Sequence, residues 1–177
     1  MKKVILILLA LSLMHEIHAQ NDSIAISQMN KLGVYYFKND TLVQITPIVM
    51  ESMESNGNPF SVNASMVYEG EFSEHVLSNI PTFYVFIPRE YNSMLNVKQF
   101  RMVTLTPKRG KRLLNTASFS MFGGRTGAKA QAMEIVNLND ECHKIYAKEV
   151  MPAGHYGIFY NYGGGAPQKL YDFDIKK

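Results

Sequence analysis

The chain has 177 residues, and its 18 basic and 15 acidic residues give a formal net charge of +3. So small an imbalance provides no long-range field to gather nucleic acid, so we expect no nucleic-acid partner. Hydrophobic residues make up 46% of the chain, whose length is ample for one domain with its own core.

The first 19 residues have the three parts of a secretory signal peptide. Lys2-Lys3 gives a positive start, an apolar run extends from Val4 to Met14, and Ile17-His18-Ala19 offers a small-residue cleavage site before Gln20. The apolar run is shorter than the roughly 20 helical residues that cross a bilayer, so we expect no transmembrane segment. No cysteine lies near the cleavage point, so we expect no lipid anchor. The sequence predicts an exported protein, periplasmic or extracellular.

Composition after this segment favours β structure. All ten tyrosines and all ten phenylalanines follow residue 19, and both types favour pleated, half-buried surfaces. The single cysteine, Cys142, excludes an internal disulfide. We expect it to be a buried small apolar residue; a reactive thiol or an intermolecular bridge is the alternative.

Strand-like runs separated by turn residues follow one another along the chain. A polar leader, residues 20–31, comes first. The predicted strands are then Gly33–Phe37, Leu42–Thr46, patches within Phe60–Phe72, Thr82–Ile87, Phe100–Thr106, Arg112–Thr116, Ala117–Phe122, His143–Lys148, Gly154–Tyr160 and Leu170–Ile175. Lys38-Asn39-Asp40-Thr41 predicts a tight turn, with Leu42–Thr46 as the return strand of a hairpin. Thr82–Ile87 is continuously apolar, which indicates a central strand covered on both faces. Ile48–Ser55 and Ala128–Glu134 fit either a strand or a helix.

Nine or ten short strands of this kind predict an all-β fold, an antiparallel β-sandwich that is Ig-like or jelly-roll-like. The predicted organisation is a signal peptide over 1–19, the leader over 20–31 and one β-sandwich domain over 32–177.

The two ends of this domain resemble a diffuse group of exported bacterial β-domains. The opening GVYYF-KNDTLVQITP resembles the group's GxYY and LVxL opening, and MPAGHYGIFY with KLYDFDI resembles its PxGxYGxF and YDFxI close. His155 stands where the pattern usually has Glu, and Asp174 where it has Gly. The resemblance implies an exported β-sandwich-like domain and carries over no functional residues.

Few residues offer catalytic or metal chemistry. His75, His143 and His155 lack ligand spacing, so we expect no metal and no cofactor. Asp172 and Asp174 lie on one face of the last strand, roughly 7 Å apart from strand rise. That separation suits a pair of catalytic carboxylates, but a polar outer face explains it more simply, and we name no catalytic residue.

Four cations occur within five residues at the tip of a predicted hairpin: Lys108, Arg109, Lys111 and Arg112. They suit an anion-binding patch or, more simply, a solvated tip that discourages edge association.

Tyr156, Tyr160 and Tyr162 share one side of a predicted strand. Exposed, they would form a stacking platform for a glycan or a peptide; buried, they would belong to the core.

Two functional hypotheses follow. The first is a non-enzymatic domain of the cell envelope that binds a partner protein or a glycan through loops and a strand edge. The alternative is an envelope hydrolase on a β-sandwich that uses Asp172, Asp174 or His155.

Overall fold

The structure is a computed structural model that describes residues 20–58, 61–78, 80–120, 123–126, 128, 130–161 and 169–176. The predicted signal peptide, residues 1–19, lies outside the described residues. Strands in two packed sheets dominate, so the predicted all-β sandwich is confirmed. Two short 3-10 helices, η1 (Arg89–Tyr91) and η2 (Val97–Gln99), precede one of the strands. Within the described residues, no helix is long and apolar enough to cross a membrane.

The first sheet has five strands with a doubly covered strand at its centre. Their order is β11 (Met133–Asn137), β12 (Cys142–Ala147), β7 (Thr82–Phe86), β1 (Gly33–Lys38) and β2 (Thr41–Gln44). On β7, Phe83 and Val85 point into the core between the sheets, whereas Tyr84 and Phe86 point to the opposite side. Both sides are packed, so the prediction for Thr82–Ile87 is confirmed.

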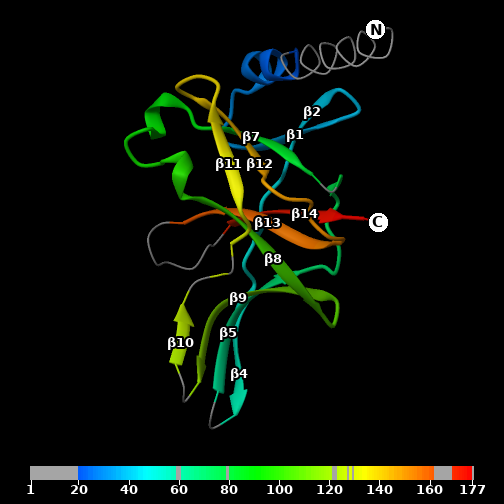
Figure 1. Cartoon of the computed structure of the whole chain (residues 1–177), viewed down its shortest axis with the longest axis vertical. Helices are drawn as coiled ribbons and strands as arrows, with labels where there is room; N and C mark the ends of the chain where they lie inside the picture. Colours follow the sequence, from blue (N-terminus) through cyan, green and yellow to red (C-terminus); the bar gives the residue numbers. More distant parts are fainter. Residues whose placement is uncertain are drawn as a thin grey trace, which may run out of the picture.

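The second sheet has nine strands and bends at one of them. Its main order is β3 (Ile48–Val49), β14 (Lys169–Ile175), β13 (Gly154–Tyr160), β8 (Phe100–Lys108), β9 (Lys111–Ser120), β5 (Ser61–Glu69) and β4 (Ser52–Asn58). In addition, β10 (Gly123–Thr126) pairs with β9, and β6 (Val76–Leu77) pairs in parallel with β14. The first six residues of β8 pair with β13 and its last three with β9. Beyond this division, β4, β5, β9 and β10 extend away from the first sheet (Figure 1).

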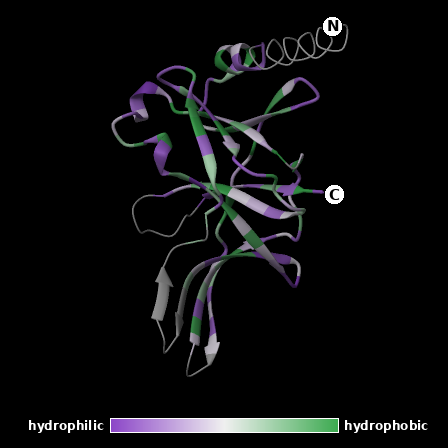
Figure 2. Cartoon of the chain, in the orientation of Figure 1, coloured by the Kyte–Doolittle hydropathy of each residue, from purple (hydrophilic) through white to green (hydrophobic). Residues whose placement is uncertain are grey.

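The bend produces two apolar cores on opposite faces of the second sheet. One lies between the sheets and includes Phe83, Phe173 and Ile158. The other fills the inside of the bend and includes Tyr68 and Leu105. Hydrophobic and hydrophilic residues alternate along the strands that line them (Figure 2).

The segment predicted as a loose polar leader is helical over residues 20–28 and covers the outer side of the first sheet (Figure 1). Ala25 and Met29 are buried there. Asp22 accepts a hydrogen bond from Lys144 Nζ on β12 at 2.9 Å. The spacing of Ala25 and Met29 places both on one helix face, which explains why a largely polar segment packs.

Two predicted hairpins are confirmed, each with a two-residue turn. Asn39-Asp40 joins β1 to β2, with φ of 49° and 60°, and Arg109-Gly110 joins β8 to β9, with φ of 53° and 78°. Positive φ at both central residues gives the type I′ geometry that matches strand twist. The ambiguous Ile48–Ser55 region contains β3 and the start of β4, so the structure has more short strands than the sequence suggested.

Candidate functional site

The cations of the β8–β9 hairpin are mostly paired with carboxylates. Lys108 Nζ lies 3.0 Å from Glu54 Oε2, and Lys111 Nζ lies 2.7 Å from Glu51 Oε2. The hydrogen bond from Lys108 lowers the pKa of Glu54. Arg109 is exposed in the turn. The hairpin tip is therefore a set of salt bridges plus one turn arginine, not the cluster of bare cations that an anion patch requires.

Arg112, predicted as the fourth surface cation, is buried with only 2% of its surface exposed. Its side chain shares the inner face of β9 with Leu114, so it points into the bend. Its Nη1 forms an ion pair with Asp172 Oδ2 on β14. Its Nε donates to the carbonyl of Gly70 at 2.9 Å and its Nη2 to that of Glu69 at 3.1 Å. The surface assignment of Arg112 is wrong.

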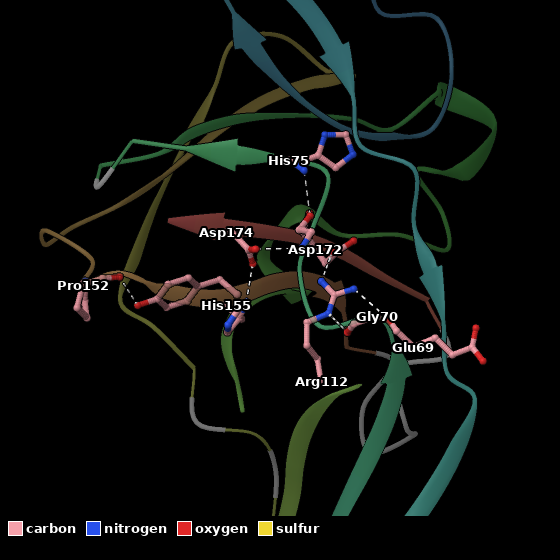
Figure 3. A network of polar contacts seen from close by, with 10 residues as sticks. Glu69, Gly70, His75, Arg112, Pro152, His155, Asp172 and Asp174 are labelled. Atoms are coloured by element: carbon pink, nitrogen blue, oxygen red, sulfur yellow. Dashed lines mark hydrogen bonds and ion pairs between the residues drawn. The ribbon is translucent and has the colours of Figure 1, made fainter. Parts of the chain in front are cut away.

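Asp172 and Asp174 are also buried, at 4% and 3% exposed, so the predicted polar outer face is wrong. Asp174 Oδ1 lies 2.8 Å from His155 Nδ1 on β13, and its Oδ2 accepts from the Ser73 backbone N–H at 3.0 Å. The Ser73 hydroxyl donates to the Asp172 carbonyl oxygen at 3.0 Å. Figure 3 shows these contacts converging on β14. This face is closed because β9 and the chain leading to β6 pack over it.

His155 and Asp174 face each other in the pairing of β13 with β14. Each therefore supplies the other with a charged or hydrogen-bonding partner.

The chain from Gly70 to His75, here called the 70–75 segment, joins β5 to β6 and is fixed at several points. The His75 N–H donates to Ser73 Oγ at 3.1 Å, and the Asp174 N–H donates to the His75 carbonyl at 2.8 Å. The Tyr36 hydroxyl lies 3.3 Å from His75 Nδ1. Gly70 adopts a φ of 81°, which glycine tolerates without strain. These hydrogen bonds hold the segment as a wall beside β14.

A cleft of about 410 Å³ lies between this wall and the end of β3, along the outer edge of β14. Its lining residues are Thr46, Ile48, Glu69, Gly70, Phe72, Glu74, His75, Arg112 and Asp172. Arg112 and Asp172 form its buried floor. Phe72, 65% exposed, stands at its rim, with its ring centroid 5.7 Å from that of His155. A second cleft of about 390 Å³ shares Ile48 and Glu69 with the first.

Tyr156, placed by the sequence in a possible exposed platform, belongs to the core between the sheets. Its ring stacks on Phe173 with centroids 5.6 Å apart, and its hydroxyl donates to the Pro152 carbonyl at 2.8 Å. Burial raises its pKa. The platform assignment is wrong for this residue.

Tyr160 is half-buried, and its hydroxyl is engaged inside the protein. It contacts Gln99 Oε1 and accepts from the Asn96 N–H at 3.0 Å. Tyr162, the third member of the proposed platform, lies outside the described residues. Tyr156 and Tyr160, the two tyrosines of the proposed platform that the structure describes, therefore do not form an open stacking surface.

The residues of the hydrolase alternative are brought together only in part. Asp174 and His155 are paired, and Asp172 lies beside Arg112. Of the three, Asp172 lines the cleft. Ser73, a nearby hydroxyl, bonds to the backbones of Asp172 and His75. Among the described residues no contact between a hydroxyl and His155 is formed, so this imidazole is not paired with a hydroxyl nucleophile.

The described residues contain no group of three or more His, Cys, Asp or Glu side chains placed to hold a metal ion. The chain matches no protein-family model, no curated protein and no solved structure. Its function is therefore inferred from the cleft and the network beneath it.

Phe72, Ser73 and Glu74 are the residues that sequence reasoning missed. They occupy a stretch that reads as the end of a weak strand followed by a solvated turn. The available signal was a large aromatic residue, Phe72, between acidic residues directly after Gly70, a pattern that a solvated turn does not require.

Proposed function

We propose that the protein is an exported, non-enzymatic domain of the bacterial cell envelope, periplasmic or extracellular, that binds a partner protein or a glycan. The observation that carries this proposal is the cleft beside β14, whose wall is held by buried hydrogen bonds and ion pairs. The signal-peptide pattern and the resemblance to exported bacterial β-domains support the location.

The network beneath the cleft suits a binding role because its groups hold the backbone in place. Arg112 holds the carbonyls of Gly70 and Glu69, and Asp174 holds the N–H of Ser73. A wall fixed before the ligand arrives loses little conformational entropy on binding. Asp174 is bonded to His155 and to the Ser73 backbone, and Asp172 is bonded to Arg112, so the three residues do not converge on one open position and the hydrolase alternative is the weaker hypothesis.

The rim supplies the contacts for recognition. Phe72 exposes most of an aromatic ring, and aromatic side chains, Phe included, are enriched at binding interfaces relative to the rest of a protein surface. Glu69 and Glu74 add hydrogen-bond acceptors beside it.

The proposal is tested by placing a photo-crosslinking amino acid at Phe72 in living cells. Met94 is the matched control, because it is 68% exposed and lies outside the cleft lining. We expect envelope material to crosslink at position 72 and not at position 94. Equal crosslinking at both positions, or none at either, would contradict the assignment of the cleft.

Export is tested separately by cell fractionation and N-terminal sequencing. We expect the protein in the periplasm or the medium, beginning at Gln20. A cytoplasmic protein that retains Met1 would contradict the location.

A further inference from the structure

We propose that the cleft beside β14 binds a neutral pyranose unit of a glycan, with Phe72 against one face of the sugar ring and the Arg112–Asp172 floor bonded to neighbouring hydroxyls. This inference rests on the proposed binding function and names its ligand class.

The floor offers a donor and an acceptor side by side. Arg112 uses one N–H on each of its three nitrogens, which leaves a second N–H on Nη1 and on Nη2. Within the described part of the chain, Asp172 Oδ1 has no hydrogen-bond partner, while its Oδ2 holds Arg112. No solvent-sealed side-chain oxygen or nitrogen of the described residues lacks a partner, so Oδ1 meets the solvent of the cleft.

Two neighbouring sugar hydroxyls match this floor. Each hydroxyl donates one hydrogen bond and accepts others, so one hydroxyl can accept from Arg112 while the next donates to Asp172. Hydrogen bonds to charged groups are roughly twice as strong as those between neutral groups, so a diol gains from both at once.

The charges of the cleft favour a neutral ligand. Arg112 and Asp172 cancel each other at the floor, whereas Glu69 and Glu74 stand at the rim. An anionic ligand would be repelled by the rim carboxylates. A hydroxyl-rich neutral ligand meets no such repulsion and donates hydrogen bonds to the same carboxylates, and the amino sugars in the test below show whether these carboxylates favour a cationic ligand instead.

Phe72 gives the site an apolar face of the right kind. Its ring lies against His155, and most of its surface remains exposed at the rim. An aromatic ring offers a flat, electron-rich face that attracts C–H groups, and one face of a pyranose carries a patch of such groups.

The dimensions suit a short glycan. The cleft volume of about 410 Å³ lies within the range of roughly 300–1,000 Å³ usual for small-molecule sites. The second cleft of about 390 Å³, which shares Ile48 and Glu69 with the first, provides room for a neighbouring sugar unit.

The test is binding of the purified protein to an array of neutral oligosaccharides, made of glucans, galactans, mannans and N-acetylglucosamine oligomers, with acidic and amino sugars included. The variants are Phe72→Ala, Phe72→Leu and Phe72→Tyr, with Met94→Ala as the exposed-residue control. We expect binding to neutral members. Loss of the aromatic ring in the Ala and Leu variants lowers affinity roughly tenfold, while the Tyr and Met94 variants keep it.

Four outcomes would overturn the inference: no binding to the array, binding only to charged sugars, full affinity in Phe72→Leu, or equal loss in Met94→Ala. The crosslinking experiment separates the two proposals. Protein partners captured at position 72 together with an empty array would leave a binding domain whose ligand is not a glycan, whereas failure of both experiments would remove the binding function itself.

Discussion

The side chain of Leu170 on β14 occupies the space that a Cβ atom on Gly157 of β13 would fill. An added Cβ would lie 2.6 Å from Leu170 Cδ1 and 2.7 Å from its Cγ. Gly157 also faces Asp172 in the strand pairing. Because Gly157 has no side chain, Leu170 of β14 can pack directly against the backbone of β13, next to the polar network.

We expect Gly157→Ala to lower the free energy of unfolding by about 1–3 kcal/mol, because overpacking forces Leu170 or the backbone to move. Gly154→Ala on the same strand is the control, since its Cβ would make only ordinary contacts with Tyr156, the nearest at 3.5 Å. Chemical denaturation measures both variants. Equal effects at positions 157 and 154 would show that the contact with Leu170 is not the cause.

Breaking the ion pair between Arg112 and Asp172 should lower the free energy of unfolding more than breaking a pair of the hairpin tip. Removing one partner of a buried pair leaves an uncompensated charge, so we expect Arg112→Met to lower the free energy of unfolding by about 3–5 kcal/mol. Lys111→Met breaks the exposed pair with Glu51, which solvent screens, and should change the free energy of unfolding far less than Arg112→Met does. Replacing Asp172 by Leu in the Arg112→Met background should recover part of the loss. A cost for Arg112→Met no larger than that for Lys111→Met would show that the buried pair contributes little.

The thiol of Cys142 should not react with thiol reagents until the protein unfolds locally or globally. It is fully buried beneath the N-terminal helix, and burial raises its pKa to about 12, so almost no thiolate forms at neutral pH. We expect a thiol-reactive dye to label the native protein only at the rate of opening, and denatured protein at once. Rapid labelling of native protein would contradict the burial.

The same thiol reports on the N-terminal helix. Asp22 accepts from Lys144 and from the Tyr84 hydroxyl, the latter at 2.8 Å, so Asp22→Ala removes the polar anchor of the helix. We expect faster labelling of Cys142 in this variant. Ser27→Ala is the control, because the one side-chain hydrogen bond of Ser27 to a described residue goes to the carbonyl of Ile24, within the same helix. Similar rates in the two variants would mean that the anchor does not hold the helix down.

Acid should weaken the fold through His143. Burial lowers the pKa of this residue, so the unfolded chain takes up its proton at a higher pH than the folded protein does. Its contribution to stability is complete above about pH 6.5, the unfolded value, and is lost as the pH falls from there through the folded pKa.

We expect the free energy of unfolding to fall between about pH 7 and pH 5, with His143 contributing at most about 1.4 kcal/mol per pH unit. The variant His143→Gln keeps a hydrogen-bonding side chain near Asn137 and should show a shallower slope. Identical slopes would show that His143 is not the titrating group, because His75 and His155 are present in both proteins.

Local patterns predicted the strands and hairpins well. The apolar run Thr82–Ile87 and the turn residues Asn39-Asp40 specify their structures through neighbours in sequence. The alternation of Asp172 and Asp174 with Phe173 also predicted correctly which residues share a face. It did not say whether that face is covered, because the cover comes from Ser73 and Arg112, which are far away in the sequence.

The hairpin cations also show that a sequence pattern does not tell which side of a strand is covered. Lys111 and Arg112 are adjacent and chemically alike, yet one lies on the exposed side of β9 and the other inside the bend. Only the bend at β8 makes that inner side a buried one. No residue pattern within β9 predicts that its inner side is buried.

The position of β14 has a consequence for how the molecule becomes competent to bind. In the described residues, β3 and β6 form ladders only with β14, and the bond from Ser73 to Asp174 spans 101 positions of the chain. Contacts between such distant segments close late and slow the folding of β-rich domains. The cleft lies between β3 and β6, so we expect its walls to assemble after the local β1–β2 and β8–β9 hairpins. During refolding, we therefore expect ligand binding to recover later than the β1–β2 and β8–β9 hairpins form.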